Sequence, residues 1–466
     1  MAGSRAAWSR TVLARPWLLL FVPVNAATSG FGVVLPLLVL SRFHGSLLDV
    51  STAAVLFNVS VIFASMLWGH LSDRFPRRRA FLLLNFGSYA AGYAALGLVP
   101  SLPFLFVVYT LLGFLTPAGS SASNLLILEK FPEAERPAAF ASFQEMSILG
   151  GIAGVMAGFV WLEAGGTLLP LLYLFAALAA LACLGAWRAV EPPVVRLTTR
   201  QVARNAVSLA SRIRHASAGL IPIPFFPRRP NLRPGALARF RLWSVEELRH
   251  ELPLILGAAF LFNLSASLFN TSYTPYLYAA GLGGAAIFLV NAANNAAQGV
   301  AFPFSGRLAD RMGSTRLVGY GTYLRAVSYL ALTLAAAAPL LLGGVYSVNL
   351  VFFGLAGAAI ALYSTASSLL LFRALDRRDA GTTLGLSSAL GGIASVLGAF
   401  LSGILSFFGS YRLTFLVSSF ALLASLPLWS AAEVAARRRR ERLTGPVGVG
   451  EPPVRGARNS ERPAID

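Results

Sequence analysis

The chain has 466 residues, of which 56% are hydrophobic and 12% charged, with a formal net charge of +19 at pH 7. Soluble globular proteins carry about 25% charged residues, so this composition excludes the soluble class and indicates a polytopic membrane protein. The arginines that carry the positive charge lie in a few inter-helix segments and tails. We therefore expect anionic lipid headgroups, and not nucleic acid, as the partner of these basic segments.

Apolar stretches of the length that a bilayer-spanning helix needs, about 20 residues, recur along the whole chain. After a polar N-terminal segment, 1–16, the first stretch is longer than the core of a signal peptide, so it is predicted to be an uncleaved membrane helix. The first half is predicted to contain helices at 17–40, 50–69, 80–99, 102–128, 137–162 and 167–188. The second half is predicted to contain helices at 252–279, 284–306, 316–336, 343–372, 381–407 and 411–432. The expected fold class is an all-α membrane protein with twelve transmembrane helices in two bundles, 17–189 and 251–433.

Basic residues are concentrated in every second link between the predicted helices. The odd-to-even links contain almost none, Arg42 and Arg412 being the exceptions, whereas the even-to-odd links and the central segment contain most of them. Because basic loops remain on the cytoplasmic side of a membrane, both termini are expected to be cytoplasmic. The expected location is the cell (plasma) membrane.

A basic segment, 190–250, separates the two halves. Its part 201–220 alternates apolar and basic residues in a pattern typical of a helix lying on the membrane surface, whereas the five prolines between 222 and 234 exclude a continuous helix there. A membrane-surface tether and a disordered linker are both open interpretations. The tail 434–466 is basic and then rich in Pro and Gly, so it is expected to be disordered and cytoplasmic.

An eleven-residue motif occurs once in each half. Residues 69–79 are Gly-His-Leu-Ser-Asp-Arg-Phe-Pro-Arg-Arg-Arg, and residues 306–316 are Gly-Arg-Leu-Ala-Asp-Arg-Met-Gly-Ser-Thr-Arg. Two more pairs of similar segments, 120–127 with 364–371 and 150–155 with 391–396, keep nearly the same spacing. The chain is therefore predicted to be a duplicated six-helix unit.

The pattern Gly-x-Leu-x-Asp-Arg-x-Gly-x-x-Arg, between the second and third helices of each half, resembles the signature loop of the major facilitator superfamily. The resemblance implies two pseudo-symmetric six-helix bundles, with a substrate site near the midplane between them, and transport by alternating access. It also implies that the motif forms a conformational gate, in which Asp73 and Asp310 latch the cytoplasmic side in the outward-facing state. The gate residues are Gly69, Asp73, Arg74, Arg77, Gly306, Asp310, Arg311 and Gly313. The first copy departs from the family pattern at Pro76, and a merely electrostatic membrane anchor is the alternative role.

Two ionisable residues lie well inside predicted helices, where charge is costly enough to mark a functional candidate. Glu145 in helix 5 and Arg325 in helix 9 each lie roughly 12–14 Å deep, at about 1.5 Å per residue. Glu145 is the candidate for proton coupling; a structural carboxylate hydrogen-bonded by Gln144, Ser142 or Ser147 is the alternative. Helix 9 is usually peripheral in the family, which favours a structural pair for Arg325 over a substrate contact.

Helix 8 carries four amide side chains at positions i, i+3, i+4 and i+7, which places them on one helical face. A polar stripe within lipid must be satisfied by partners, so we expect these amides to line a polar cavity; hydrogen bonds between helices are the alternative. The candidates for this substrate cavity are Asn25, Tyr109, Gln144, Asn263, Asn270, Tyr273, Asn291, Asn294, Asn295 and Gln298.

Helix 5 contains four glycines, Gly150, Gly151, Gly154 and Gly158, that resemble the fifth-helix motif of drug/proton antiporters. The proline that follows glycine in that motif is missing, and Tyr109 stands where those antiporters have a fourth-helix arginine. Close helix packing is a sufficient explanation of the glycines. These departures weaken an assignment to drug efflux and leave the superfamily resemblance intact.

The sequence lacks the motifs that are typical of several other functional classes. It contains no Walker lysine motif, and its single Cys and four His show no metal-ligand spacing. We therefore expect no enzymatic activity, no cofactor and no metal, and predict a monomeric secondary transporter, a symporter or antiporter coupled to H⁺. A small polar metabolite is favoured as substrate. Efflux of hydrophobic compounds is the alternative within transport, and a transporter-like membrane sensor or receptor is the alternative of another class.

Overall fold

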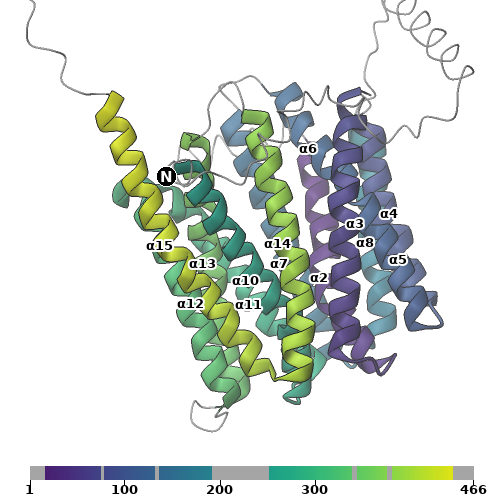
Figure 1. The fold of residues 1–466 in the computed structure, drawn as a ribbon. Helices are drawn as coiled ribbons and strands as arrows, with labels where there is room; N and C mark the ends of the chain where they lie inside the picture. Colours follow the sequence, from purple (N-terminus) through teal and green to yellow (C-terminus); the bar gives the residue numbers. More distant parts are fainter. Residues whose placement is uncertain are drawn as a thin grey trace, which may run out of the picture.

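The computed structural model describes residues 16–74, 78–131, 136–190, 251–337, 344–374 and 380–443. All regular secondary structure in these segments is helical, and the helices stand side by side (Figure 1). The segment 191–250 and the tail 444–466 lie outside the described residues. The predictions of a tether or linker and of a disordered tail fall there.

The first half contains six membrane crossings. Its elements are η1 Pro16–Leu20, α2 Phe21–Ser41, α3 Leu47–Arg74, α4 Arg78–Leu98, α5 Leu102–Leu115, α6 Pro117–Lys130, α7 Arg136–Glu163 and α8 Leu168–Ala189. The turn η1 leads directly into α2, so these two form one crossing. α5 and α6 also form one crossing, interrupted at Pro117, because proline has no N–H to continue the helical hydrogen bonds.

The second half contains six more crossings. Its elements are α10 Glu251–Ala279, α11 Gly284–Met312, α12 Ser314–Ala337, α13 Val345–Ala374, α14 Ala380–Phe408 and α15 Tyr411–Leu443. The protein is thus an all-α membrane protein with twelve transmembrane helices, as the sequence predicts.

Two helices differ from the rest in polarity. Ten crossings in the described part of the chain are long and apolar enough to span a membrane by composition, and α11 and α12 are not among them. α11 carries the four amides of the predicted stripe, and α12 carries Arg325. Both helices pack extensively on α13. This packing gives their polar side chains protein surroundings in place of lipid.

The two halves repeat the same pattern of helix contacts. α2 packs on α7 and α4 on α8 in the first half, as α10 packs on α14 and α12 on α15 in the second. α3 packs on α5 and α6, as α11 packs on α13. The halves meet mainly along two seams, α7 against α11 and α3 against α14. α3 and α11 are the second crossings of their halves, and α7 and α14 are the fifth. Each seam therefore joins a second crossing to a fifth crossing of the other half, as expected for a duplicated unit.

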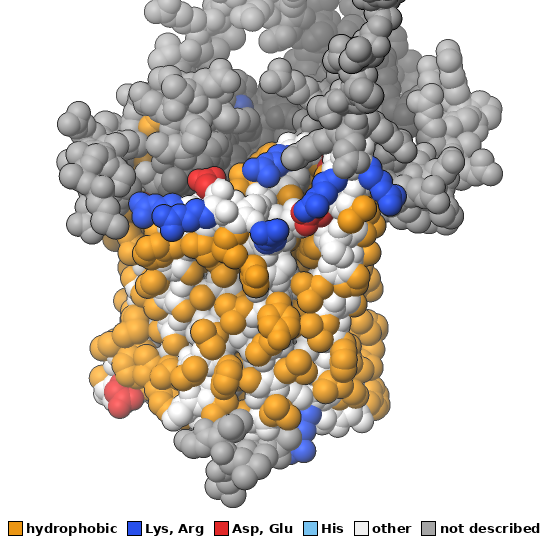
Figure 2. All heavy atoms as spheres, turned by 90° about the vertical axis from the view of Figure 1, so that its left-hand side faces the viewer, with side chains coloured by type: hydrophobic (Ala, Val, Ile, Leu, Met, Phe, Trp, Pro, Cys, Tyr) orange, Lys and Arg blue, Asp and Glu red, His pale blue; other side chains and the backbone are white. Residues whose placement is uncertain are grey.

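The outer surface is a wide hydrophobic belt, and most of the basic side chains visible in Figure 2 gather at one end of it. We call this the arginine-rich end; it contains the α11–α12 turn and the end of α13, with Arg311, Arg316 and Arg373. The belt includes exposed side chains such as Phe400 and Phe420. Large apolar side chains facing outward are expected where the solvent is lipid.

The described contacts between the halves are close at the opposite end. Gly158 of α7 lies so near Phe288 of α11 that a methyl group at Gly158 would overlap the Phe288 ring. At the other seam, a Cβ atom added to Gly403 of α14 would lie 2.7 Å from the Ser51 hydroxyl oxygen of α3. The helices therefore pack tightly at this end.

Candidate functional site

A polar cavity of about 280 Å³ lies between the halves. Four helices form it: α2, α7, α11 and α13. Its lining residues are Ser29, Gln144, Ser147, Ile148, Gly151, Asn295, Gln298, Phe302, Ile360 and Ser364. We call it the inner cavity. Its hydrogen-bonding groups come from both halves of the chain, which is the arrangement that a site between two duplicated bundles requires.

Three amide side chains in the inner cavity have no hydrogen-bond partner in the described part of the chain. Gln144, Asn295 and Gln298 form no hydrogen bond with any residue that the structure describes. Each amide offers two N–H donors and a carbonyl acceptor. Gln144 is exposed and Asn295 and Gln298 are half-buried, so all three amides are available to hydrogen-bond a polar ligand.

The predicted amide stripe of α11 divides into two pairs. Asn291 donates to the carbonyl of Ile287 at 2.9 Å, and Asn294 donates to the carbonyl of Phe353 on α13 at 2.7 Å. Asn295 and Gln298 instead line the inner cavity. The first pair therefore stabilises the helix and its contact with α13, and the second pair is available to a ligand.

A second cavity, of about 660 Å³, lies along the same seam and is mostly apolar. We call it the side cavity. It is lined by Gln144, Glu145, Ile148, Leu149, Ile152, Ala296, Gly299, Val300, Phe302 and Pro303, all from α7 and α11. Gln144, Ile148 and Phe302 line both cavities. The two cavities are therefore neighbours that share a wall.

The Glu145 side chain is exposed and lines the side cavity. It forms no hydrogen bond or ion pair with the described residues. The alternative role of Glu145 was a structural carboxylate hydrogen-bonded by Gln144, Ser142 or Ser147. The Ser147 hydroxyl instead donates to the carbonyl of Phe143 at 2.9 Å, and Ser142 is buried. The structure thus places the carboxyl of Glu145 at the apolar wall of a cavity, beside the unpaired Gln144 amide.

The other cavity candidates take part in helix packing. Asn25 of α2 donates to the carbonyl of Phe21 at 2.7 Å and to the Ser147 hydroxyl of α7 at 3.3 Å. Asn263 donates to the carbonyl of Ala259 at 2.8 Å, and Asn270 is exposed.

Two candidate tyrosines lie in aromatic clusters. Tyr109 stacks on Phe57 with ring centroids 4.6 Å apart. Tyr273 is 1% exposed, and its hydroxyl donates to the Oδ1 atom of Asn349 at 2.9 Å. Neither tyrosine is among the lining residues of the inner or side cavity.

Arg325 is buried inside the second half. Its Nε atom donates to the Tyr329 hydroxyl at 2.7 Å, and its guanidinium carbon lies 4.9 Å from the centre of the Phe262 ring. Cation–π contacts of this kind partly replace the hydration that a buried cation loses. This environment agrees with a structural role for Arg325, which its position in helix 9 favoured over a substrate contact. The partners of the guanidinium group are aromatic and not acidic.

The structure describes the second copy of the signature motif completely. Gly306 to Met312 are the last residues of α11, and Gly313 forms the turn with φ +85°. That backbone angle favours glycine, and it is not available to proline, whose ring fixes φ near −65°. Pro76 stands at the matching position of the first copy, outside the described residues. Asp310 and Arg311 are exposed.

The structure describes less of the first copy. Gly69, Asp73 and Arg74 lie at the end of α3, and only their backbone is described. Arg77 and Pro76 lie outside the described residues. The charge pairing expected of Asp73 therefore stays a prediction.

The glycines of α7 bring its backbone close to α2. A Cβ atom at Gly150 or Gly154 would overlap the backbone carbonyl oxygen of Val22 or Ala26, respectively. Both glycines are thus required for this close approach, which is the packing role expected from the sequence.

Ser147, Phe302, Ile360 and Ser364 were missing from the predicted cavity residues. Ser364 begins the second copy of the repeated segment 364–371, so its place in a repeat was a usable signal. Phe302 and Ile360 are apolar residues, the first on the more polar α11 and the second on the apolar α13. No sequence pattern distinguishes such cavity-lining residues from core residues.

The model of the Major Facilitator Superfamily matches residues 17–244 and 255–458. A comparison with curated proteins finds no match. Among solved structures, the nucleoside transporter NupG aligns with 14% identity and a TM-score of 0.60, covering 89% of this chain and 98% of its own.

Two further solved structures show the same fold. The peptide transporter POT aligns with 15% identity and a TM-score of 0.65, covering 90% of this chain and 94% of its own. A bacterial homolog of the human lysosomal transporter Spinster, in an inward-facing and unoccupied conformation, aligns with 14% identity and a TM-score of 0.62, covering 92% of this chain and 98% of its own. At these identities the similarity is one of fold.

Proposed function

Since the chain belongs to the Major Facilitator Superfamily, a family of membrane transporters, we propose that it is a secondary active transporter that moves a small polar molecule by alternating access, coupled to protons. The observation that carries this proposal is the set of three unpaired amides, Gln144, Asn295 and Gln298, in a cavity between the halves. They offer donors and acceptors to a hydrogen-bonding substrate, and they come from both bundles.

Glu145 is proposed as the proton-coupling carboxylate. It lies next to Gln144, which lines the inner cavity, and it lines the mostly apolar side cavity itself. Protonation of Glu145 therefore removes a charge from the wall that adjoins the substrate cavity. This arrangement links the charge of one residue to the surroundings of the substrate.

The contacts between the halves support an inward-facing state. They are tight at the end opposite the arginine-rich end, where Gly158 meets Phe288. The side cavity lies around the middle of α7 and α11, slightly nearer the arginine-rich end. With the arginine-rich end at the cytoplasm, as the basic loops favour, this state would exchange substrate with the cytoplasm, and the signature loops would be unlatched.

A second candidate is transport of a more hydrophobic compound, and the apolar side cavity favours it. Leu149 and Val300 are half or more exposed on opposite walls of that cavity. Because the inner and side cavities adjoin, an amphipathic molecule could place its polar part among the amides and its apolar part between α7 and α11.

A binding screen tests the proposal. The purified protein is heated with panels of polar metabolites and of hydrophobic drugs, because a ligand that binds only the folded state raises Tm. Compounds that stabilise the wild type should lose this effect with Asn295→Ala plus Gln298→Ala. Asn291→Ala is the matched control on the same helix, outside the cavity.

The screen also separates the two candidates. Loss of the shift with Leu149→Asn alone would favour the hydrophobic compound. Equal shifts in the wild type and the double amide variant would contradict binding in the inner cavity.

A further inference from the structure

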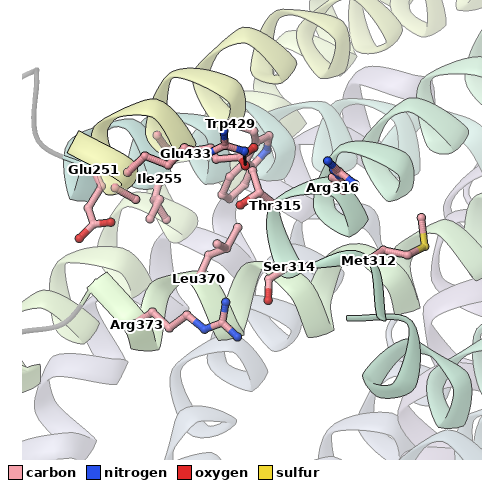
Figure 3. A pocket seen from close by; sticks show the side chains of 14 residues that line it. Glu251, Ile255, Met312, Ser314, Thr315, Arg316, Leu370, Arg373, Trp429 and Glu433 are labelled. Atoms are coloured by element: carbon pink, nitrogen blue, oxygen red, sulfur yellow. Dashed lines mark hydrogen bonds and ion pairs between the residues drawn. The ribbon is translucent and has the colours of Figure 1, made fainter. Parts of the chain in front are cut away.

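A third cavity, of about 350 Å³, lies within the second half at the arginine-rich end. It forms where the α11–α12 turn meets the start of α10 and the ends of α13 and α15 (Figure 3). It shares no lining residue with the inner or side cavity. We call it the surface cavity.

Two arginines of the surface cavity have no partner among the described residues. Arg316 of α12 and Arg373 of α13 are exposed and form no hydrogen bond or ion pair there. The third arginine, Arg437, is paired with Glu433 at 2.6 Å. Arg316 and Arg373 therefore carry two positive charges at the rim that no described residue pairs with, in a cavity that Glu251 and Glu433 also line.

Two buried hydrogen-bond donors also line the surface cavity without partners. The Ser314 side chain is 2% exposed and the Trp429 side chain 1% exposed. Neither the Ser314 hydroxyl nor the Trp429 indole N–H forms a hydrogen bond with a residue that the structure describes. A buried donor without a partner costs free energy that a bound acceptor would recover.

The same place is the N-terminus of a long helix. α12 begins at Ser314 and runs to Ala337, so the first backbone N–H groups of its 24 residues point toward this end. Helix N-termini attract anions through these N–H groups and the helix dipole. Figure 3 shows Ser314 and Arg373 facing a shared space beside Leu370.

We propose that the surface cavity binds a phosphate group, supplied by the headgroup of an anionic phospholipid. Two guanidinium groups, a helix N-terminus and two unpartnered donors match the several acceptor oxygens and the negative charge of a phosphate. The cavity lies at the arginine-rich end, and the basic side chains at that end border the hydrophobic belt (Figure 2), which is the level of lipid headgroups. A free phosphate ion has the same chemistry and is distinguished by experiment.

The test measures binding to the full-length protein, without transport. Native mass spectrometry counts phosphatidylglycerol and phosphatidylcholine molecules bound in detergent, and a thermal-shift titration follows inorganic phosphate. We expect phosphatidylglycerol to bind more tightly than phosphatidylcholine. The double variant Arg316→Gln plus Arg373→Gln should weaken phosphatidylglycerol binding by roughly twentyfold, since each arginine near an anionic headgroup contributes about fivefold.

Two further variants separate a built site from general surface charge. Ser314→Ala should weaken phosphatidylglycerol binding while leaving the lipid-free protein at least as stable as the wild type, because the hydroxyl that it removes has no partner. Arg438→Gln is the matched control: Arg438 is exposed, lies next to Arg437 on α15 and does not line the cavity. It should bind lipid like the wild type.

Each outcome decides something. Loss of phosphatidylglycerol binding in the cavity variants alone supports the headgroup site. Loss of inorganic phosphate binding in the same variants, with no preference for phosphatidylglycerol, supports a phosphate site but overturns the lipid as its source. Unchanged lipid binding in the double arginine variant, or an equal loss in Arg438→Gln, overturns the proposal. A failure here leaves the transport proposal unaffected, because that proposal rests on other cavities.

Discussion

Arg325 donates a hydrogen bond of 2.7 Å from its Nε atom to the hydroxyl of Tyr329, one turn further along α12. The guanidinium group lies between two aromatic rings, since its carbon is 4.9 Å from the centre of Phe262 and 5.2 Å from the centre of Tyr329. No carboxylate in the described part of the chain forms an ion pair with it. A buried cation in this setting depends on its hydrogen bond and its aromatic neighbours.

We expect Tyr329→Phe to destabilise the protein by about 1.5–3 kcal/mol, because the charged donor loses its acceptor. Arg325→Met should leave the stability of the protein nearly unchanged. An apolar side chain of similar size removes the buried charge, so no hydrogen bond or aromatic contact is required to compensate for it. Thermal unfolding of the purified variants measures both effects. If Arg325→Met lost ligand binding while remaining folded, the arginine would be a substrate contact and not a structural residue.

Glu145→Gln should retain substrate exchange at equal pH but lose accumulation driven by a pH gradient. The amide imitates the protonated carboxyl and is unable to release a proton. The measurement compares both modes of transport in proteoliposomes, with a substrate found in the screen. Glu163→Gln is the matched control, because Glu163 is an exposed acid on the same helix and lies outside both cavities. Gradient-driven accumulation by Glu145→Gln at the wild-type level would refute the coupling role.

Gly313→Ala should cost about 1–3 kcal/mol of stability, because its φ of +85° is strained for any residue with a Cβ atom. Gly306→Ala, seven residues earlier in the helical part of the same motif, meets open space and should instead stabilise by about 0.5–1 kcal/mol. Thermal unfolding of the two single variants gives the comparison. Equal effects from both substitutions would show that the turn does not require glycine.

If the signature loop forms the gate that the family resemblance implies, Asp310→Asn should slow transport while leaving the folded protein in the membrane, because it removes the charge of the latch residue. Asp310 is exposed and lies in the last turns of α11. The experiment compares initial uptake rates at equal amounts of protein in the membrane. A wild-type rate would reduce the second signature loop to a membrane anchor.

Topology is tested by labelling single cysteines in a Cys183→Ala background. Ser347 and Arg438 are exposed at opposite ends of the molecule, Ser347 in the first turn of α13 and Arg438 near the end of α15. An impermeant thiol reagent added to intact cells should label Ser347→Cys and not Arg438→Cys, since the arginine-rich end is proposed to be cytoplasmic. The reverse pattern would invert the orientation.

The sequence predicted the crossings well because the thickness of the bilayer fixes the length of each apolar helix. It was less accurate at the arginine-rich end, where α11 continues to Met312 although the prediction ended at residue 306. Charged side chains such as Arg307 and Asp310 are exposed there, so they do not interrupt the helix.

The candidate site was predicted only in part. The spacing of the α11 amides placed them on one face, yet Asn294 reaches a carbonyl of α13 and Gln298 reaches the cavity. That difference depends on how α11 is rotated against its neighbours, which periodicity does not determine.

The glycine contacts between α7 and α2 also have a mechanical consequence. Because Gly154 allows the two backbones to touch, and Asn25 is hydrogen-bonded to Ser147, α7 has little freedom to slide along α2. Widening of the inner cavity must then occur between Gln144 on one side and Gln298 on the other. A molecule hydrogen-bonded to both amides fixes the distance between the bundles, so analogues of increasing length should hold the bundles at increasing separations.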